Sequence, residues 1–194
     1  MEFSQIEFNE ARAGAPKPKL LLHCCCAPCA SYVIEFLSPL YLITALFFNP
    51  NIRPREEYDL REGELRKLLT LAAPDDRVDM LETLYEGDAF EAAAAPYWDE
   101  PEGGGRCRAC FELRLGETAA LAAKHGFDCF ATTLTVSPHK PAQIINDVGG
   151  AAAELYGVDY LPSDFKKRDG YKRSIELSRQ YGLYRQRYCG CRSE

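Results

Sequence analysis

The sequence predicts an α/β protein in which a mostly parallel sheet carries helices on both faces. Short apolar runs typical of strands alternate with longer segments of helical periodicity. Right-handed crossovers between parallel strands place helices on both faces of such a sheet. The 194 residues suffice for one domain with a hydrophobic core and are too few for two. We expect an N-terminal extension over residues 1–18 and a single α/β domain over residues 19–194.

The first half of the chain contributes alternating strands and helices. The run YLITALFF is apolar without a break, as in strands that are covered on both faces of a sheet, and the prolines and asparagines of NPNIRP end it. The second helix places four leucines on roughly one face, namely Leu60, Leu65, Leu68 and Leu69. We expect strands over residues 19–25, 41–48 and 78–81 and helices over residues 30–37 and 56–71.

The second half continues this alternation. Asp88 is a good helix N-cap, Pro96 ends the alanine-rich helix that follows, and Gly126 stops the next helix at its C-terminal cap. A glycine-rich loop precedes that next helix, so that a Cys-Arg-Ala-Cys motif lies at a helix start. We expect helices over residues 88–95 and 107–125, a helix that follows the turn SPHKP, and a helix over most of residues 164–182. We expect strands over residues 128–136 and 158–161.

Composition narrows the possible classes of protein. With 46% hydrophobic, 11% aromatic and 27% charged residues, the chain is an ordinary globular protein and not a disordered, collagen-like or coiled-coil one. Its longest apolar stretch, residues 40–48, is far shorter than the ~20 residues of a membrane-spanning helix. The start of the chain carries acidic residues and lacks the apolar core of a secretory signal. We therefore expect a cytoplasmic protein with no membrane partner.

Charge is distributed unevenly along the chain. The net charge is −6 overall, whereas residues 165–194 hold nine Lys or Arg and three Asp or Glu, which gives this segment +6. A basic end on an acidic body can hold a polyanion locally. The simpler alternative is a solvated helix face, and the overall acidic charge does not by itself indicate nucleic-acid binding.

Nine cysteines are the strongest functional signal in the sequence. In a reducing cytosol, clustered cysteines bind metal or perform redox chemistry more often than they form structural disulfides. Thiolates are soft ligands, and sets of four select zinc or an iron–sulfur cluster. The nine residues fall into three groups and one single cysteine: Cys24, Cys25, Cys26 and Cys29; Cys107 and Cys110; Cys189 and Cys191; and Cys129.

The first group is placed where α/β sheets bind their ligands, because Cys25, Cys26 and Cys29 follow the first expected strand. Adjacent cysteines suit a single structural zinc poorly, since neighbouring side chains diverge along a strand. At the junction of a strand and a turn, however, both can face one larger cluster. Buried packing of small thiols is the alternative interpretation.

The other two groups have motifs of their own. At a helix start, the thiolates of Cys107 and Cys110 gain from the helix dipole and the neighbouring arginines. The spacing Cys189-Gly190-Cys191 fits either a shared metal site or a strained, readily reduced disulfide. A chance pair of exposed thiols is the alternative for this second motif.

Three other residues are expected to be structural. Strand alternation places Cys24 in the core. Cys129 lies between Phe127 and Phe130, which indicates buried packing. His23 lies within the first strand and is expected to be a hydrogen-bonded core residue.

The chain resembles the QueH family of cobalamin-independent, iron–sulfur epoxyqueuosine reductases in four segments that occur in the same order: LLLHCCCAPCASY, FFNPNIRPREEYDLR, CRACFELRL and YRQRYCGC. The resemblance covers nearly all of the chain between Leu20 and Cys191. It implies a Rossmann-like domain of the HUP and PP-loop type. It also implies the two-electron deoxygenation of epoxyqueuosine in tRNA to queuosine, which is the last step of queuosine synthesis. The implied partners are tRNA carrying epoxyqueuosine in its anticodon loop and an external electron donor.

The resemblance further implies cofactors and the residues that hold them. The ligands of a 4Fe-4S cluster correspond to Cys25, Cys26, Cys107 and Cys110. The redox-active pair corresponds to Cys189 and Cys191. An additional mononuclear metal, iron, is implied beside the cluster, with candidate ligands Cys29, Cys189 and Cys191. Cys24 departs from the family motif by extending it to three cysteines in a row.

The segment after the first strand also separates the chain from PP-loop ATPases, which carry an SGGxDS phosphate loop there. HCCCAPCA lacks glycines and cannot offer a row of backbone amides to pyrophosphate, so we expect no ATP binding. Two alternative functions remain open. One is a zinc-binding structural module that uses the same four cysteines, and the other is a cluster-free thiol–disulfide or sulfur-transfer enzyme that uses Cys189 and Cys191. Neither accounts for all three cysteine groups together.

Overall fold

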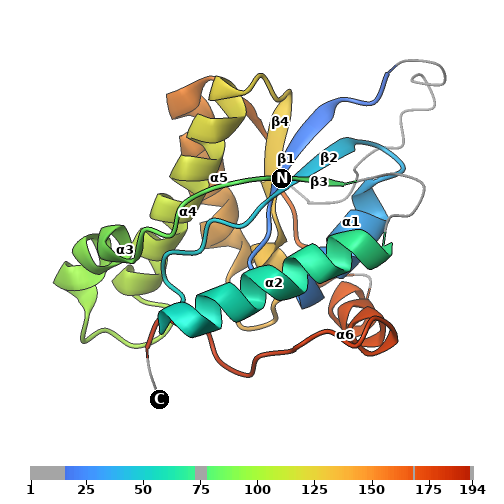
Figure 1. Cartoon of the computed structure of the whole chain (residues 1–194). Coiled ribbons are helices and arrows are strands. Elements are labelled where there is room, and N and C mark those ends of the chain that lie inside the picture. Colours follow the sequence, from blue (N-terminus) through green and yellow to red (C-terminus); the bar gives the residue numbers. More distant parts are fainter. Residues whose placement is uncertain (1–15, 73–77, 168, 193–194) are drawn as a thin grey trace.

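Five parallel strands form the central sheet of the computed structural model, which describes residues 16–72, 78–167 and 169–192 (Figure 1). The spatial order is β3-β2-β1-β4-β5, with every neighbouring pair parallel. The strands are β1 (Lys19–His23), β2 (Leu42–Leu46), β3 (Asp79–Leu81), β4 (Cys129–Thr132) and β5 (Asp159–Tyr160). This is the strand order of a Rossmann-like sheet, and it confirms the expected fold class.

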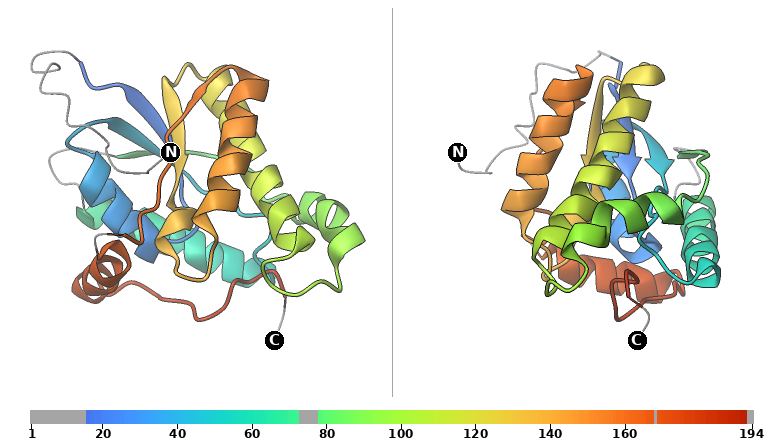
Figure 2. Two further views of the ribbon diagram at one scale, coloured as in Figure 1. Left: turned by 180° about the vertical axis from the view of Figure 1, so that it is seen from behind. Right: turned by 90° about the vertical axis from the view of Figure 1, so that its left-hand side faces the viewer.

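The helices cover both faces of the sheet (Figure 2). On one face α4 packs along α5, and on the other α1 packs against both α2 and α6. The helices are α1 (Ala27–Leu37), α2 (Arg55–Ala72), α3 (Gly87–Ala94), α4 (Gly105–Lys124), α5 (Ala142–Tyr156) and α6 (Gly170–Gln180), and two short 3-10 helices are η2 (Ala95–Tyr97) and η3 (Thr133–Val136).

Side-chain alternation along β1 supplies apolar residues to both faces. Leu20 and Leu22 pack in the cluster that contains Val33 of α1 and Leu65 of α2. Leu21, between them in sequence, packs in a separate cluster with residues of α4 and α5. All three leucines are fully buried, as expected for a central parallel strand with helices on both sides.

The chain connections change direction between β1 and β4, and this is where sheets of this type form a crevice beyond the carboxyl ends of the strands. His23 ends β1 and lies in register with Thr132, which ends β4. Its ring Nδ1 lies 2.8 Å from Thr132 Oγ1. His23 is fully buried, which confirms the expected hydrogen-bonded core histidine. The loops that follow these strands therefore begin side by side.

Two elements differ from their expected bounds for local reasons. The strand expected over residues 128–136 stops at Thr132, because the Thr132 hydroxyl accepts a hydrogen bond of 3.2 Å from the Leu134 N–H and starts η3. The first helix begins at Ala27, three residues earlier than expected, since Pro28 fits its first turn.

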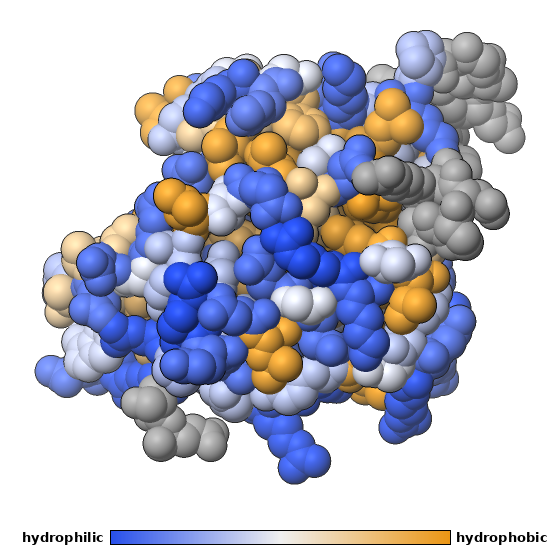
Figure 3. Space-filling view, in the orientation of Figure 1, coloured by the Kyte–Doolittle hydropathy of each residue, from blue (hydrophilic) through white to orange (hydrophobic). Residues whose placement is uncertain are grey.

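One of the four leucines expected on the same face of α2 is not covered. Leu65 and Leu68 are fully buried, whereas Leu60 is 46% exposed. Figure 3 shows a mostly hydrophilic surface with separate hydrophobic spots on the side of the molecule where α2 lies.

The segment 164–182, expected to be mostly helical, contains a shorter helix than expected. Among its described residues, only Gly170–Gln180 form a helix, α6.

The described residues that precede β1 take no part in the sheet. Residues 1–15 of the expected extension lie outside the described residues, and residues 16–18 form neither helix nor strand. The division into an extension and one domain over residues 19–194 stays a prediction. In the described part of the chain, every helix is either too short or too polar to cross a bilayer.

Two adjacent glycines of α5 provide a test of how this helix packs. A Cβ at Gly149 would lie 2.4 Å from the Tyr160 ring, whereas a Cβ at Gly150 meets nothing within 4 Å. Tyr160 cannot easily move, because its hydroxyl donates to Asn146 Oδ1 at 3.0 Å and its ring packs on Phe130. We expect Gly150→Ala to raise the free energy of unfolding by about 0.5–1 kcal/mol, and Gly149→Ala to lower it by about 1–3 kcal/mol. Urea denaturation measures both, and equal effects would contradict this packing.

Burial of His23 predicts a dependence of stability on pH. Burial, and then the charge of Arg114, lowers the pKa of His23 from 6.5 to about 3. The unfolded chain therefore binds a proton that the folded chain rejects, and stability falls as the pH drops below the unfolded pKa. From about pH 7.5 to about pH 5.5 we expect a loss of about 1.4 kcal/mol in metal-free protein.

Urea denaturation at the two pH values measures this loss. His23→Gln should remove most of the pH dependence, and His139→Gln, at an exposed position, should leave it unchanged. An equal loss in wild type and in His23→Gln would show that another group is responsible.

Candidate functional site

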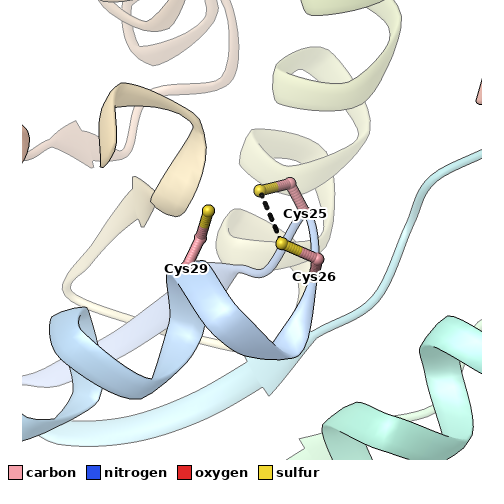
Figure 4. Close-up of side chains that lie close together, drawn as sticks. All are labelled: Cys25, Cys26 and Cys29. Atoms are coloured by element: carbon pink, nitrogen blue, oxygen red, sulfur yellow. Dashed lines mark hydrogen bonds between the residues drawn. The ribbon is translucent and has the colours of Figure 1, made fainter. Parts of the chain in front are cut away.

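Three cysteines converge where β1 leads into α1 (Figure 4). Cys25 and Cys26 lie on the connecting loop, and Cys29 lies in the first turn of α1 with its sulfur turned back toward them. The three Sγ atoms lie within 4.8 Å of one another, and those of Cys25 and Cys26 are 3.8 Å apart. A group of three thiols at these separations could hold a metal ion.

Thr133, the first residue of η3, fixes the position of Cys25. Its hydroxyl accepts a hydrogen bond of 3.0 Å from the Cys25 N–H and donates one of 3.3 Å to the Cys25 sulfur. Asn49 supports the same loop, because its Nδ2 donates to the Cys24 carbonyl at 2.9 Å. Cys24 itself is fully buried, which confirms its expected place in the core.

The thiols of this group share protons unequally. Hydrogen bonds from the thiols of Cys26 and Cys29 lower the pKa of Cys25 well below its ordinary value. The same contacts with Cys25 raise the pKa of Cys26 to about 11 and also raise that of Cys29. Of the three thiols, Cys25 therefore loses its proton most readily.

Cys107 and Cys110 lie in the first turns of α4. The Gly103 N–H donates to Cys107 Sγ at 3.2 Å, so a backbone amide reaches this motif at the helix start. Cys110 is buried, and burial raises the pKa of its thiol. Arg114, one helical turn farther on, donates from Nη1 to Cys110 Sγ at 3.8 Å.

Cys189 and Cys191 belong to the segment that follows α6, and α2 holds this segment in place. Arg61 donates to the Cys189 carbonyl at 3.1 Å, and the Arg53 N–H donates to the Gly190 carbonyl at 2.8 Å. Gly190 adopts φ 94°, a conformation that suits glycine. In Figure 1 the segment runs alongside α2 toward the C-terminal end.

The terminal pair is present as free thiols in this structure. The Cys191 thiol donates a hydrogen bond to Cys189, and this lowers the pKa of Cys189 to about 5 although burial opposes the shift. The positive charges of Lys140 and Arg114 lower it further. The two thiols therefore differ strongly in proton affinity.

Two neighbouring cavities bring the cysteine groups together. The first, which we call the thiol cavity, has a volume of about 430 Å³ and contains four cysteines in its wall, namely Cys107, Cys110, Cys189 and Cys191. The second, the polar pocket, has a volume of about 290 Å³ and is lined by Cys25, Asn51, Arg61, Gln186 and Cys189, among others. Cys189, Arg114 and Lys140 line both. The three groups thus surround one region at the carboxyl ends of β1 and β4.

The structure divides the predicted ligands into two groups. It places Cys29 with Cys25 and Cys26, and it places Cys107 and Cys110 with the terminal pair. The assignment of four of these cysteines to a cluster and of the others to a second metal or a redox pair stays a prediction. Cys129, expected to be buried, is half-buried at the edge of the core.

Sequence reasoning missed several residues of this region. Arg114 lies four residues after Cys110, and this helical spacing was the signal that could have revealed it. It is 2% exposed and donates to His23 Nε2 at 3.3 Å and to Asn49 Oδ1. Lys140 follows β4 in the loop before α5; burial lowers its pKa, but the thiolates of Cys189 and Cys25 raise it more strongly. No sequence pattern marks Lys140 or Thr133.

Comparison with known proteins identifies the family of the chain. A family model described as epoxyqueuosine reductase QueH matches residues 20–193. An epoxyqueuosine reductase QueH from Streptococcus pyogenes serotype M1 is 45% identical over 177 residues, which is 90% of this chain and 69% of that protein. The protein of the same name from Staphylococcus epidermidis is 46% identical, over 90% of this chain and 75% of its own length. That from Thermotoga maritima is 34% identical, over 89% and 88%. The chain belongs to the epoxyqueuosine reductase QueH family.

Proposed function

We propose that this protein reduces epoxyqueuosine in tRNA to queuosine, the last step of queuosine synthesis. Family membership over residues 20–193 supports the proposal. The observation that carries it is the convergence of three cysteine groups, from residues 25–29, 107–110 and 189–191, on two adjoining cavities. We place the reaction in the cytoplasm, where these thiols remain reduced.

The reaction requires a source of electrons. Removal of the epoxide oxygen leaves an alkene and water, and it consumes two electrons and two protons. An iron–sulfur cluster, when bound, supplies electrons at potentials within roughly −700 to +450 mV. Side chains alone do not reach the low end of this range, so an external electron donor completes the cycle.

The chemistry of the side chains fits such a cofactor. We assign Cys25, Cys26, Cys107 and Cys110 as ligands of a 4Fe-4S cluster, because thiolates are the ligands that hold these clusters. Hydrogen bonds to the sulfurs tune a cluster. Gly103 N–H, Thr133 and Arg114 supply such bonds here.

The remaining cysteines fit a second metal, iron, beside the cluster. Cys29 lies within 4.8 Å of the Cys25 and Cys26 sulfurs, and Cys189 lines both cavities. Cys189 and Cys191 either complete this metal site or relay electrons. As a dithiol, the pair releases two electrons and two protons when it closes to a disulfide, which matches the demand of the reaction.

The substrate tRNA is expected to contact the basic C-terminal segment. Lys172, Arg179 and Arg187 are exposed and can reach phosphates. The tyrosines of this segment are engaged within the protein: Tyr184 donates to Glu57, and Tyr188 packs under the Arg61 guanidinium. These two tyrosines therefore pack within the protein.

ATP has no place in this proposal. In the position of a phosphate loop, the chain between β1 and α1 carries cysteine sulfurs, and Pro28 in the first turn of α1 has no N–H to offer to a phosphate.

The proposed activity is tested with oxygen-free protein, epoxyqueuosine-containing tRNA and a strong chemical reductant. We expect nucleoside mass analysis to show loss of one oxygen atom from the modified base. Cys191→Ser should abolish turnover while leaving the visible absorption of the cluster intact. An unchanged nucleoside with iron-loaded wild type would refute the activity, and full activity of Cys191→Ser would refute the role of the pair.

The cluster assignment predicts a difference between two single cysteine substitutions. Cys110→Ser should reduce bound iron and sulfide to less than about half of the wild-type content, since clusters of this kind use four thiolates. Cys129→Ser is the matched control, because Cys129 packs at the edge of the core away from both cavities. Colourless wild-type protein that contains zinc would instead support the structural zinc module, which the close grouping of Cys25, Cys26 and Cys29 alone would allow.

A further inference from the structure

The polar pocket contains buried hydrogen-bonding atoms that the protein leaves unpaired. Asn51 and Arg61 are each 2% exposed, and both line the pocket together with Gln186. Asn51 Oδ1, Arg61 Nη2 and Gln186 Oε1 are buried without a hydrogen-bond partner. Buried polar atoms are nearly always paired, and leaving three of them unpaired in the walls of one pocket is costly. Such atoms point to a ligand that supplies the missing partners.

The other polar atoms of these three side chains already form hydrogen bonds within the protein, and these bonds fix the orientation of each side chain. Asn51 Nδ2 donates toward Cys189 Sγ at 4.0 Å. The Gln186 amide donates toward the Cys26 sulfur, an interaction that lowers the pKa of Cys26 against the larger effect of Cys25, which raises it. Because both amide nitrogens are turned to sulfur, the amide oxygens are the atoms left for a ligand. Arg61 is held through Nε by Glu57 at 2.7 Å and through Nη1 by the Cys189 carbonyl.

This set of atoms selects the chemistry of the ligand. Arg61, Arg114 and Lys140 around the pocket would attract an anion. An ionised phosphate or carboxylate, however, offers only acceptors and would leave both amide oxygens without a donor. A hydroxyl group donates one hydrogen bond and accepts others. Neighbouring hydroxyls on a small ring can therefore satisfy both amide oxygens and the guanidinium together.

We propose that the polar pocket binds the hydroxyl-bearing five-membered ring of the modified base, with Asn51, Arg61 and Gln186 as its specificity-determining residues. This inference rests on the proposed function, because the ring of epoxyqueuosine carries hydroxyl groups next to the epoxide. Cys25 and Cys189 lie in the same wall, so a ring bound here is next to the cysteine groups.

The test compares the affinity of the iron-loaded enzyme for two tRNAs that differ only in carrying epoxyqueuosine or unmodified guanosine at the same position. The ratio of the two dissociation constants isolates the contribution of the modified base. Gln186→Met keeps the length of the side chain and removes the acceptor, and we expect the ratio to fall roughly fivefold to tenfold. Gln186→Glu keeps an acceptor and should retain most of the preference. Gln143→Met, at an exposed position of α5, is the matched control and should change nothing.

Iron content and thermal unfolding are measured for each variant, so that a damaged site is recognised, and Asn51→Ala provides a second acceptor deletion with the same expected result. Wild-type discrimination in both acceptor deletions would overturn the assignment. Loss of the preference in millimolar inorganic phosphate, with no effect of the substitutions, would show an anion site instead and would also overturn it. If the wild type deoxygenates the base but Gln186→Met keeps the full ratio, only the pocket assignment fails. If iron-loaded wild type neither deoxygenates the base nor prefers the modified tRNA, the proposed function fails.

Discussion

The buried guanidinium of Arg114 constrains the whole region at the carboxyl ends of the strands. This side chain is 2% exposed, and its hydrogen bonds go to His23, Asn49 and Cys110, none of which is a carboxylate. A buried charge needs compensation. Here the compensation comes from sulfur, since Cys25 and Cys189 have lowered pKa values to which Arg114 contributes. The same cation fixes His23 at the end of β1 and thereby joins the sheet to the site.

A second set of contacts ties the C-terminal segment to α2. Glu57 pairs with Arg61, Arg61 holds the Cys189 carbonyl, and Tyr184 donates its hydroxyl proton to Glu57 and its N–H to Glu64. These are side-chain contacts to an irregular segment, not a sheet or a helix pair. The position of Cys189 and Cys191 between the two cavities therefore depends on a few polar residues of one helix, and Arg61 links this support to the polar pocket.

Much of the fold follows from the sequence, whereas the details of the site do not. Uninterrupted apolar runs predicted the central strands, and the glycine-rich loop placed Cys107 and Cys110 at a helix start, as observed. Leu60 shares a face with the other leucines of α2 by periodicity, but periodicity does not show how much of that face is covered, and Leu60 is exposed. β4 ends at Thr132 because its side chain caps the start of η3, and the β-propensity of the sequence does not predict this cap. Lys140 and Asn51 reach the site from loops and Thr133 reaches it from η3, so that tertiary structure alone decides which of these side chains meet.

The site is discontinuous along the chain, and this has a consequence for biosynthesis. Residues 25–29 leave the ribosome more than a hundred and fifty codons before residues 189–191, given their separation in the sequence. Until residues 189–191 dock on α2, the thiols of residues 25–29 lack the wall that Cys189 provides. Nascent chains are thus vulnerable to peroxide and to the wrong metal during this interval. Delivery of a cofactor to both cavities must therefore follow the synthesis and docking of residues 189–191.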